Sequence, residues 1–468
     1  MKINSQIELC VRTDISPYRH PRLLEALEKD LTFENPKFKE AERLGFSTFS
    51  IPRTLKLVYQ SPAGTWYIPR GHVRTVLKHF PDEKIEHLTC DAWNQHVLYF
   101  NEDFSLDERQ LRCLEAIGKK KQGLILAATS SGKSAIILAA IAKLQQNALI
   151  IVNRQVLLDQ LLEDAEKYLS GCTIGVLNGR NKEIGQVTFA IDKTLQELLR
   201  SEDEKARNNP HDPELLRNKF GLIIVDEVHT ASCPTMTSIL SRLPAKHRYG
   251  LTGTLKRKDR LEFYIYGLFG EVIAEVSKDE IIEAGRAVPY TVHLLETEAV
   301  VTNGPDNESP TAYWKRIDTE LHASEQRENI LFEAVRASIL AGETPAIGFR
   351  YVEPCKRLVA RLAEAGLPVS LLIGGVKDPR TVCTEVQEGK TKGIVATYGT
   401  FATGVNIPKL DHLFIASPSY SNELLLHQLR GRILRNDAGK KKAKVTFLFD
   451  EYVFPRHKVN RVVRILER

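Results

Sequence analysis

Short apolar runs alternate with helical stretches over most of this 468-residue chain. In the first part these runs are LILAA, ALIIVN, QVTFAI and FGLIIVDE, and a second series begins at about residue 291 with PAIGFRY, VSLLIGG, KGIVATY, HLFIAS and KVTFLFD. Short runs without polar alternation are typical of parallel strands that are covered by helices on both faces. The pattern therefore predicts two α/β domains in tandem.

Residues 1–102 show a different pattern. SIPRTLKLVYQ and GTWYIPRG predict strands around a turn at SPAG. We therefore expect three domains: a smaller β-containing N-terminal domain over 1–102, and α/β domains over 103–290 and 291–468. The polar segments 201–214 and 303–316 are predicted to be surface loops or insertions.

The composition excludes several classes of protein. Hydrophobic residues make up 43% of the chain and charged residues 26%, which is typical of a globular protein. No apolar stretch approaches the roughly 20 residues of a membrane span, and the N-terminus lacks the apolar core of a signal peptide. The seven cysteines form no C-x-x-C pair, so neither a zinc site nor a disulfide framework is indicated. We expect a cytoplasmic protein without a membrane partner.

The stretch from Arg43 to Pro81 contains no Asp or Glu, although 59 of the 468 residues are acidic. Its cations alternate with aromatic residues, an arrangement that suits a phosphate backbone and stacked bases. The alternative is a small β-rich domain whose aromatic residues form a core, and the two interpretations are compatible. The six cations are Arg43, Arg53, Lys56, Arg70, Arg74 and Lys78.

The segment AATSSGKSAII, which begins at Ala127, follows an apolar run and precedes a helical stretch. Gly132, Lys133 and Ser134 match the end of the phosphate-loop pattern G-x-x-x-x-G-K-[ST]. A loop between a strand and a helix directs backbone N–H groups at phosphate. Lys133 would reach the terminal phosphates and Ser134 would bind Mg²⁺. The alternative is an ordinary strand–loop–helix with an exposed lysine.

The run FGLIIVDEVH places Asp226 and Glu227 at the end of a second apolar strand. Two adjacent carboxylates at a buried strand end are costly unless a cation pairs with them. Asp226 would hold Mg²⁺ and Glu227 would polarise the attacking water. A solvated acidic strand end is the alternative.

Four motifs in this order resemble those of superfamily 2 helicases and translocases: ATSSGKS, DEVH, LTGT at 251–254 and QLRGRILR at 428–435. ERQ at 108–110 resembles the glutamine region that contacts adenine in this superfamily. Many members have alanine at the first glycine position of the phosphate-loop pattern, and Ala127 takes that position here. Ser130, where glycine is usual, is a milder departure.

A closer resemblance is to phage branch-migration helicases of the UvsW type and to the XPB-like group. YGTFATGVNIPKLDHLFIASPS at 398–419 and TGTLKRKDR carry this resemblance. Two departures concern DNA contact and coupling: VNR at 152–154 replaces the usual V-P-T, and Asn406 stands where many relatives have Asp.

The resemblance implies two RecA-like parallel-sheet domains with an ATP site between them, and ATP and Mg²⁺ as cofactors. It implies an ATP-driven DNA helicase, acting as a monomer on a single tracking strand and on forked or four-way-junction DNA, in the host cytoplasm if phage-encoded. The catalytic residues implied are Lys133, Asp226, Glu227, Arg432 and Arg435. The nucleotide-binding residues implied are Gln110, Thr129, Ser130, Ser131, Gly132, Lys133, Ser134 and Gly404, with Ser134 and Asp226 on the metal. The coupling residues are Thr252, Gly253, Thr254 and Gln428. The nucleic-acid contacts are Arg154, Thr194, Thr397 and Thr400, to which the acid-free stretch adds Arg70 and Arg74.

Three other functions remain possible at this point. An RNA helicase of the DEAD-box type usually carries S-A-T and H-R-x-G-R, where this chain has TGT and QLRGR. A restriction-type motor would need a nuclease site, and the D-x-K at Asp82 to Lys84 has no acidic partner between 43 and 81. An ATP-gated scaffold without hydrolysis would not need Glu227 or the arginines of QLRGRILR.

Overall fold

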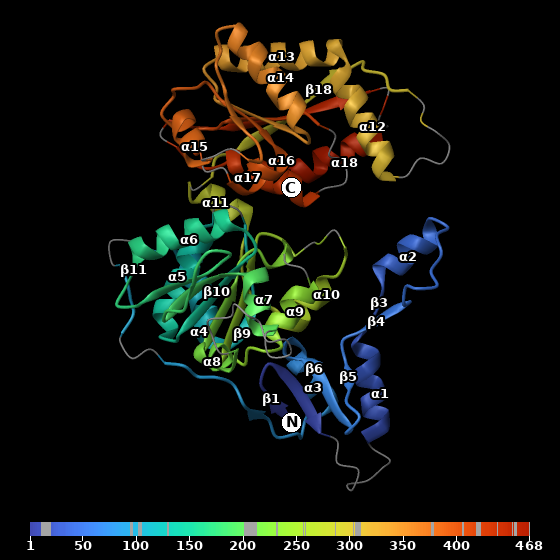
Figure 1. The fold of residues 1–468 in the computed structure, drawn as a ribbon, viewed down its shortest axis with the longest axis vertical. Coiled ribbons are helices and arrows are strands. Elements are labelled where there is room, and N and C mark those ends of the chain that lie inside the picture. The colour runs from blue at the N-terminus through green and yellow to red at the C-terminus, as the bar shows by residue number, and fades with distance from the viewer. Residues whose placement is uncertain are drawn as a thin grey trace. The chain divides into compact units, whose positions relative to one another are not determined.

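A computed structural model gives the fold of the chain (Figure 1). The residues it describes are 1–10, 20–93, 97–101, 105–128, 131–200, 213–230, 233–255, 257, 259–285, 287–302, 304, 310–375, 379–404, 407–417, 423–437, 439–451, 453 and 456–467. These residues form two compact units, Met1–Ser277 and Lys278–Arg468. The predicted three-part division at residues 102 and 290 stays a prediction.

The first unit contains an eight-stranded sheet in the order β13-β12-β14-β10-β15-β16-β9-β17. All neighbours in this sheet are parallel except β12 and β13. Its strands are β9 Gln122–Ala127, β10 Ala148–Val152, β12 Ile174–Leu177, β13 Lys182–Glu183, β14 Val187–Ile191, β15 Leu222–Val225, β16 His247–Thr252 and β17 Val272–Val276. The helices are α4 Glu108–Lys119, α5 Lys133–Leu144, α6 Gln155–Tyr168, α7 Asp192–Arg200, α8 Pro213–Lys219, α9 Cys233–Leu240 and α10 Glu262–Phe269, with a 3₁₀ turn η2 Val228–Thr230.

The central strands of this sheet are buried on both faces. Every residue of β10 and β15 is buried. Because β15, β16 and β9 are adjacent and parallel, their carboxyl ends lie at one edge, with Val225 opposite Gly250 and Thr252 opposite Leu126. The loops after these three strands are therefore neighbours, although they are far apart in sequence.

The N-terminal part of the first unit has its own sheet, in the order β5-β6-β2-β1-β7. Its strands are β1 Lys2–Ile3, β2 Gln6–Cys10, β5 Tyr59–Gln60, β6 Thr65–Pro69 and β7 Glu86–His87. A second pair, β3 Thr32–Glu34 and β4 Thr54–Lys56, brackets helix α2 Pro36–Arg43. Helices α1 His20–Asp30 and α3 Val73–His79, with the 3₁₀ turn η1 Arg70–His72, complete this part. The predicted strand SIPRTLKLVYQ is thus two strands in different sheets, β4 and β5.

A short antiparallel pair follows the N-terminal part along the chain. Strand β8 Tyr99–Phe100 pairs with β11 Leu169–Ser170, which follows α6. This pairing attaches the segment before α4 to the periphery of the first unit.

The second unit has a six-stranded sheet in the order β18-β23-β22-β19-β21-β20, in which every neighbouring pair is parallel. Its strands are β18 Tyr290–Thr297, β19 Pro345–Phe349, β20 Ser370–Leu372, β21 Ile394–Thr397, β22 His412–Ile415 and β23 Ala443–Asp450. The helices are α11 Lys278–Glu283, α12 Pro310–Ala323, α13 Glu325–Leu340, α14 Val352–Glu364, α15 Pro379–Gln387, α16 Tyr398–Gly404, α17 Glu423–Ile433 and α18 Arg456–Glu467. The two parallel sheets and the smaller N-terminal sheet confirm the predicted fold class.

Helices begin inside both segments that the sequence predicts as loops. The segment 303–316 was expected to be a loop, but α12 begins at Pro310 inside it, so the prediction is wrong for its second half. Pro310 is the first residue of that helix, a position where its missing N–H costs no hydrogen bond. In the segment 201–214, residues 213 and 214 begin α8, and the remainder lies outside the described residues. Within the described ranges, no helix is both long and apolar enough to cross a bilayer.

A buried ion pair ties α13 to the end of the second sheet. Nε of Arg327 lies 2.6 Å from Oδ1 of Asp450, and the side chains are 2% and 0% exposed. Asp450 also accepts a hydrogen bond of 2.7 Å from the Thr297 hydroxyl, and Arg327 donates to the carbonyl of Ala416. The geometry satisfies both charges, so the removal of either leaves the other buried without a partner.

We predict that Asp450→Asn lowers the free energy of unfolding of the second unit by about 3–5 kcal/mol, because the Arg327 charge is left buried and unpaired. Urea unfolding followed by circular dichroism measures this change. The matched control is Glu451→Gln, which removes the neighbouring exposed pair between Glu451 and Arg456 and should cost about 0–1 kcal/mol. Equal effects of the two variants would contradict the prediction.

Candidate functional site

The loop after β9 leads directly into helix α5. Gly132 is the residue before the helix, with φ +77°, a left-handed conformation that favours glycine. A Cβ added there would lie 2.3 Å from Nε2 of Gln110. Gln110 is buried and its amide donates to the carbonyl of Ser131 at 3.1 Å. The glycine therefore permits both the turn and the approach of the glutamine.

Gln110 has a second contact at the start of α4. Its Oε1 accepts a hydrogen bond of 3.1 Å from the backbone N–H of Asp107, whose carboxylate in turn caps the helix. This capping box fixes the side chain between the helix terminus and the phosphate-loop candidate. Gln110 lies beside the loop, and its contact with adenine stays a prediction.

The side chains of Lys133 and Glu227 form an ion pair across the edge of the sheet. They lie 94 residues apart in sequence, and both side chains are mostly buried, with 16% and 22% exposed. Asp226 is also buried, and its carboxylate accepts a hydrogen bond of 2.9 Å from the backbone N–H of Glu227. The structure thus brings together three of the five charged residues that the sequence assigns to catalysis.

The pKa of Asp226 shows the cost of this arrangement. Burial raises it above its usual range, the positive charge of Lys133 acts in the opposite direction, and the negative charge of Glu227 raises it further. A cation beside these carboxylates would stabilise their charged forms. The two carboxylates of the site therefore outnumber its one lysine.

Glu227 has an unusual backbone conformation. Its φ is +49°, in the left-handed region that a non-glycine residue adopts at a cost of about 1–3 kcal/mol. The turn is held by Thr230, whose backbone N–H and hydroxyl both donate to the carbonyl of Glu227, at 2.9 and 2.7 Å. Asn153 donates to the Thr230 hydroxyl at 2.6 Å. In this strained conformation the carboxylate of Glu227 faces Lys133.

His229 connects this turn to the end of β16. Its Nδ1 makes a hydrogen bond with the Thr252 hydroxyl and lies 3.4 Å from Oε2 of Glu227. Burial lowers the pKa of His229 to about 4, so the ring is neutral at pH 7. Its backbone carbonyl accepts a hydrogen bond of 2.7 Å from Arg257. The predicted coupling residue Thr252 is thus linked to Glu227 through one histidine.

The loop and its surroundings fit a nucleotide phosphate with Mg²⁺. The hydroxyl of Ser131 is buried without a hydrogen-bond partner, and the N-terminus of α5 follows directly. The Ser134 hydroxyl hydrogen-bonds to Asp164 of α6. The described residues contain no cluster of three or more metal-ligating side chains. Such a site matches Mg²⁺, which is usually held by one or two carboxylates together with substrate phosphates.

The remaining predicted nucleotide and coupling residues are distributed as follows. Thr129 and Ser130 lie outside the described residues, as does Asn406. Gly253 and Thr254 follow β16, and the carbonyl of Thr254 accepts a hydrogen bond of 2.6 Å from the Thr252 hydroxyl. This turn keeps the TGT motif beside His229.

In the second unit, α17 carries Gln428 and Arg432, and Arg435 follows the helix. Burial lowers the pKa of Arg435 to about 9, and the charge of Arg432 contributes, which indicates that the two guanidinium groups lie near each other. Gly404 is the last residue of α16. The roles of these four residues stay predictions.

The predicted nucleic-acid contacts differ in exposure. Arg154 precedes α6 and is exposed, whereas Thr194 in α7 is buried. The hydroxyls of Thr397 and Thr400 bond to each other at 2.8 Å, and that of Thr400 also donates to the carbonyl of Leu372. Internal packing therefore accounts for the three threonines in this structure, and their contact with DNA stays a prediction.

The expected contact between Arg70 and DNA is wrong for this geometry. Arg70 is 4% exposed and donates hydrogen bonds of 2.6 Å to the backbone carbonyls of Ala245 and Lys246. Its guanidinium is directed into the protein and away from solvent. Arg74 remains exposed, with an ion pair to Glu271.

Sequence reasoning assigned no role to His229, Asp164 or Asn153. His229 belongs to the DEVH motif, so its position signalled a function, but its bond to Thr252 depends on the adjacency of β15 and β16. Asp164 and Asn153 carry no motif, and only the packing of α6 and β10 against the loop brings them to the site.

Comparison with known proteins agrees with this geometry. Residues 103–257 match the family described as "Type III restriction enzyme, res subunit". The chain is 26% identical over 311 residues to the probable helicase D10 of Escherichia phage T5, covering 66% of this chain and 63% of that protein. It is 26% identical over 240 residues to the ATP-dependent DNA helicase uvsW of Enterobacteria phage T4, covering 50% and 46%.

A third relative is the DNA 3'-5' helicase XPB of Kineococcus radiotolerans, 25% identical over 350 residues, covering 73% of this chain and 59% of that protein. The chain spans about half to two thirds of the length of these relatives. A solved fragment of a putative HsdR subunit of a type I restriction enzyme from Vibrio vulnificus YJ016 has the same fold, with a TM-score of 0.54 and 17% identity, covering 89% and 79%.

The matched family model covers the segment that contains the phosphate loop, the paired carboxylates and the TGT motif. The geometry unites these three motifs at one edge of a parallel sheet, and the relatives are helicases of phages and of the XPB group. The chain therefore resembles superfamily 2 helicases, with UvsW-type and XPB-like helicases among its relatives.

Proposed function

We propose that this protein is an ATP-dependent DNA helicase or translocase that unwinds or branch-migrates forked and junction DNA. The observation that carries the proposal is the ion pair between Lys133 and Glu227 next to Asp226, at the start of α5. A buried lysine that faces two carboxylates beside a helix N-terminus suits phosphate and Mg²⁺. In this proposal ATP and Mg²⁺ are the cofactors.

The residues of the first unit then have separate roles in hydrolysis. Lys133 would turn from Glu227 to the terminal phosphates of bound ATP, and Ser134 and Asp226 would hold Mg²⁺. Glu227, once released, orients the attacking water and accepts its proton. His229, neutral and hydrogen-bonded to Thr252, transmits the position of Glu227 to the TGT motif. The motion of one lysine thus connects nucleotide binding to a residue at the end of β16.

We further propose that Arg432 and Arg435 of the second unit stabilise the transition state of hydrolysis. Burial lowers the pKa of Arg435, and the neighbouring charge of Arg432 lowers it further. A γ-phosphate offers negative charge and planar acceptor positions to such a pair. Their contribution is therefore expected in turnover more than in nucleotide affinity.

The N-terminal part is proposed to hold duplex or branched DNA. With Arg70 buried, the candidate surface moves to α2 and the loop that follows it. Arg43 and Arg53 are exposed there, together with Phe46 at 60% and Phe49 at 100% exposure. The base of this arm is fixed, because the ring of Phe33 stacks on that of Phe263 in α10 with centroids 4.4 Å apart. A rigid, cationic arm with exposed rings suits a phosphate backbone and unstacked bases.

The first prediction for this function concerns Glu227→Gln. The variant should bind ATP and DNA but hydrolyse ATP slowly, because an amide keeps the shape of the side chain and loses the proton acceptor. Lys133→Ala should abolish DNA-stimulated hydrolysis and also weaken ATP binding. Steady-state ATPase assays with single-stranded, duplex and four-way-junction DNA and with RNA, combined with nucleotide-binding measurements, test both variants.

The control for that experiment is Glu115→Gln, an exposed residue of α4 whose replacement should leave turnover unchanged. Wild-type turnover in a folded Lys133→Ala variant would refute the site. Stimulation by RNA and none by DNA would refute the proposed substrate.

Arg432→Ala and Arg435→Ala should lower turnover by ~10³ or more if the arginines act in the transition state. ATP affinity should change far less, because the ground-state contacts come from the first unit. Single-turnover hydrolysis and nucleotide binding, measured on the same preparations, separate the two quantities. Parallel losses in both would indicate ground-state binding alone and contradict the proposed role.

The arm is tested by Arg43→Glu combined with Arg53→Glu. We predict a lower affinity for junction DNA and a salt dependence that is smaller by about one unit of slope for each lost phosphate contact. Fluorescence anisotropy at several salt concentrations measures the slope. The matched control is Lys29→Glu in α1, an exposed cation outside the arm. An unchanged slope in the double variant would show that the arm does not contact the backbone.

A further inference from the structure

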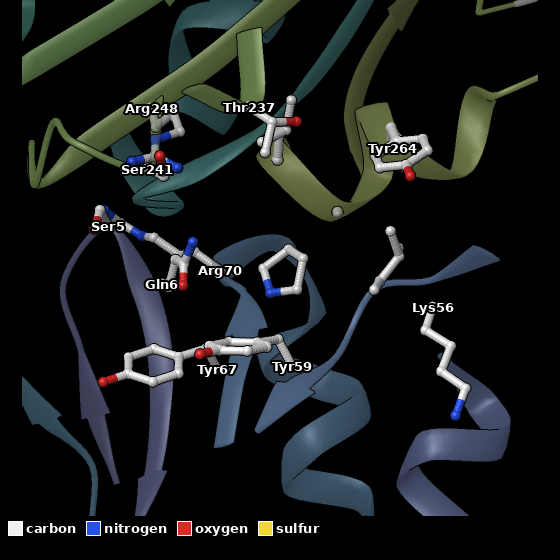
Figure 2. Close-up of a pocket in the computed structure, with 14 residues that line it drawn as sticks. Ser5, Gln6, Lys56, Tyr59, Tyr67, Arg70, Thr237, Ser241, Arg248 and Tyr264 are labelled. Carbon is white, nitrogen blue, oxygen red and sulfur yellow. The ribbon is translucent and has the colours of Figure 1, made fainter. Parts of the chain in front are cut away.

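A cavity of about 200 Å³ lies inside the first unit, between the N-terminal sheet and helices α9 and α10 (Figure 2). Strands β2 and β6 contribute Gln6 and Tyr67 from one side, and α9 contributes Thr237 from the other. None of the residues that line it belongs to the site around Lys133. One water needs about 10–15 Å³ of such space, so the cavity has room for a small organic ligand.

Two buried arginines line this cavity, and neither pairs with a carboxylate among the described residues. Arg70 donates to the carbonyls of Ala245 and Lys246 at 2.6 Å, and Arg248 donates to those of Leu240 and Leu243 at 3.0 and 2.9 Å. Carbonyl groups satisfy N–H donors but supply only partial charge. The described lining contains no Asp or Glu, and its cations are Arg70, Arg248 and Lys56, of which Lys56 pairs with Glu28.

Unused hydrogen-bonding groups occur on the same wall. Arg248 is 0% exposed, and its Nε has no hydrogen-bond partner. The hydroxyl of Thr237, one turn before Ser241, is likewise buried and unpartnered. Buried polar groups are nearly always satisfied, so an unpaired donor beside a cavity indicates a missing acceptor. An anion would satisfy both groups.

The electrostatic state of the arginines agrees with this interpretation. Burial lowers the pKa of Arg70 to about 10, and burial together with the charge of Arg70 lowers that of Arg248. Two like charges in a poorly solvated space destabilise each other, and a bound anion would relieve both desolvation and repulsion.

The wall formed by the N-terminal sheet is aromatic. The rings of Tyr59 and Tyr67 stack with centroids 5.8 Å apart, and Tyr264 of α10 lies on the other side of the cavity (Figure 2). Tyr59 is 60% exposed and the side chain of Lys56 is 56% exposed, so the cavity opens to solvent at this end. A planar ring is therefore accommodated near the mouth, and an anionic group near the arginines.

We propose that this cavity binds a nucleoside monophosphate, either free or as the terminal nucleotide of a strand. Arg248 and Thr237 hold the phosphate, and the tyrosines stack on the base. The site is separate from the ATP site, so its function does not depend on the role proposed for Lys133. The competing interpretation is that the arginines only cross-link backbone carbonyls.

The test uses the full-length protein saturated with ADP and Mg²⁺, which occupies the ATP site, and isothermal titration calorimetry with thymidine monophosphate, inorganic phosphate and thymidine. We expect thymidine monophosphate to bind at least tenfold more tightly than thymidine. Thr237→Glu, which places a carboxylate in the cavity, should lower the affinity for thymidine monophosphate at least tenfold. Thr235→Glu, on the same helix but outside the lining, is the matched control and should leave binding unchanged.

A second variant separates the two halves of the ligand. Tyr67→Ala should lower the affinity for thymidine monophosphate and leave the affinity for inorganic phosphate unchanged. If Thr237→Glu does not fold, as judged by circular dichroism, Ser241→Glu takes its place. Absence of thymidine monophosphate binding, or equal binding by the Thr237→Glu and Thr235→Glu variants, would overturn the proposal and leave the arginines with a purely structural role.

Competition identifies the source of the nucleotide. A 5'-phosphorylated thymidine tetramer that displaces thymidine monophosphate, while the unphosphorylated tetramer does not, supports binding of a strand end. Failure of the phosphorylated tetramer to compete supports a free nucleotide. Equal displacement by both tetramers would contradict recognition of the phosphate and overturn the assignment.

Discussion

The candidate site of the first unit depends on the ion pair between Lys133 and Glu227. The two side chains meet only because β15 and β9 are separated by a single strand, β16, so that their following loops share one edge of the sheet. Glu227 reaches the lysine from a left-handed backbone conformation that its own side chain disfavours. The surrounding hydrogen bonds, from Thr230 and Asn153, hold that conformation. Strain of this kind persists where the arrangement serves a function.

The same edge of the sheet places the candidate nucleotide site next to the TGT motif. His229 bonds to Thr252 at the end of β16 and lies within 3.4 Å of Glu227. Because burial keeps the ring neutral, its hydrogen-bonding pattern does not change between pH 6 and 8. A shift of Glu227 therefore alters the surroundings of Thr252 without a change of protonation. One buried side chain, His229, thus links the turn that carries Glu227 to the TGT motif.

Patterns that depend on neighbours in sequence were predictable, and contacts between distant segments were not. The apolar runs predicted four of the eight strands of the first parallel sheet and five of the six strands of the second. The order of strand, loop and helix predicted the position of Lys133, Asp226 and Glu227. Arg70 was misjudged because its burial depends on the carbonyl of Ala245, 175 residues away. Asp164 and Asn153 carry no motif, and the helical start at Pro310 was hidden by a polar composition. Residues that belong to local motifs could be predicted from the sequence, whereas contacts between distant segments could be seen only in the structure.

The acid-free stretch illustrates how one composition serves two purposes. Arg70 is directed inward, and next to it Gly71 approaches α10 so closely that an added Cβ would lie 2.0 Å from the carbonyl oxygen of Tyr266. The backbone at Gly71 therefore packs directly against α10, which joins the N-terminal part to the α/β part of the first unit. Acidic residues in this stretch would attract Arg70 away from its carbonyls and would also repel a phosphate backbone from the exposed Arg43 and Arg53. Their absence thus keeps Arg70 available for the fold and leaves Arg43 and Arg53 exposed at the surface, which suits the proposed role of the arm in holding DNA.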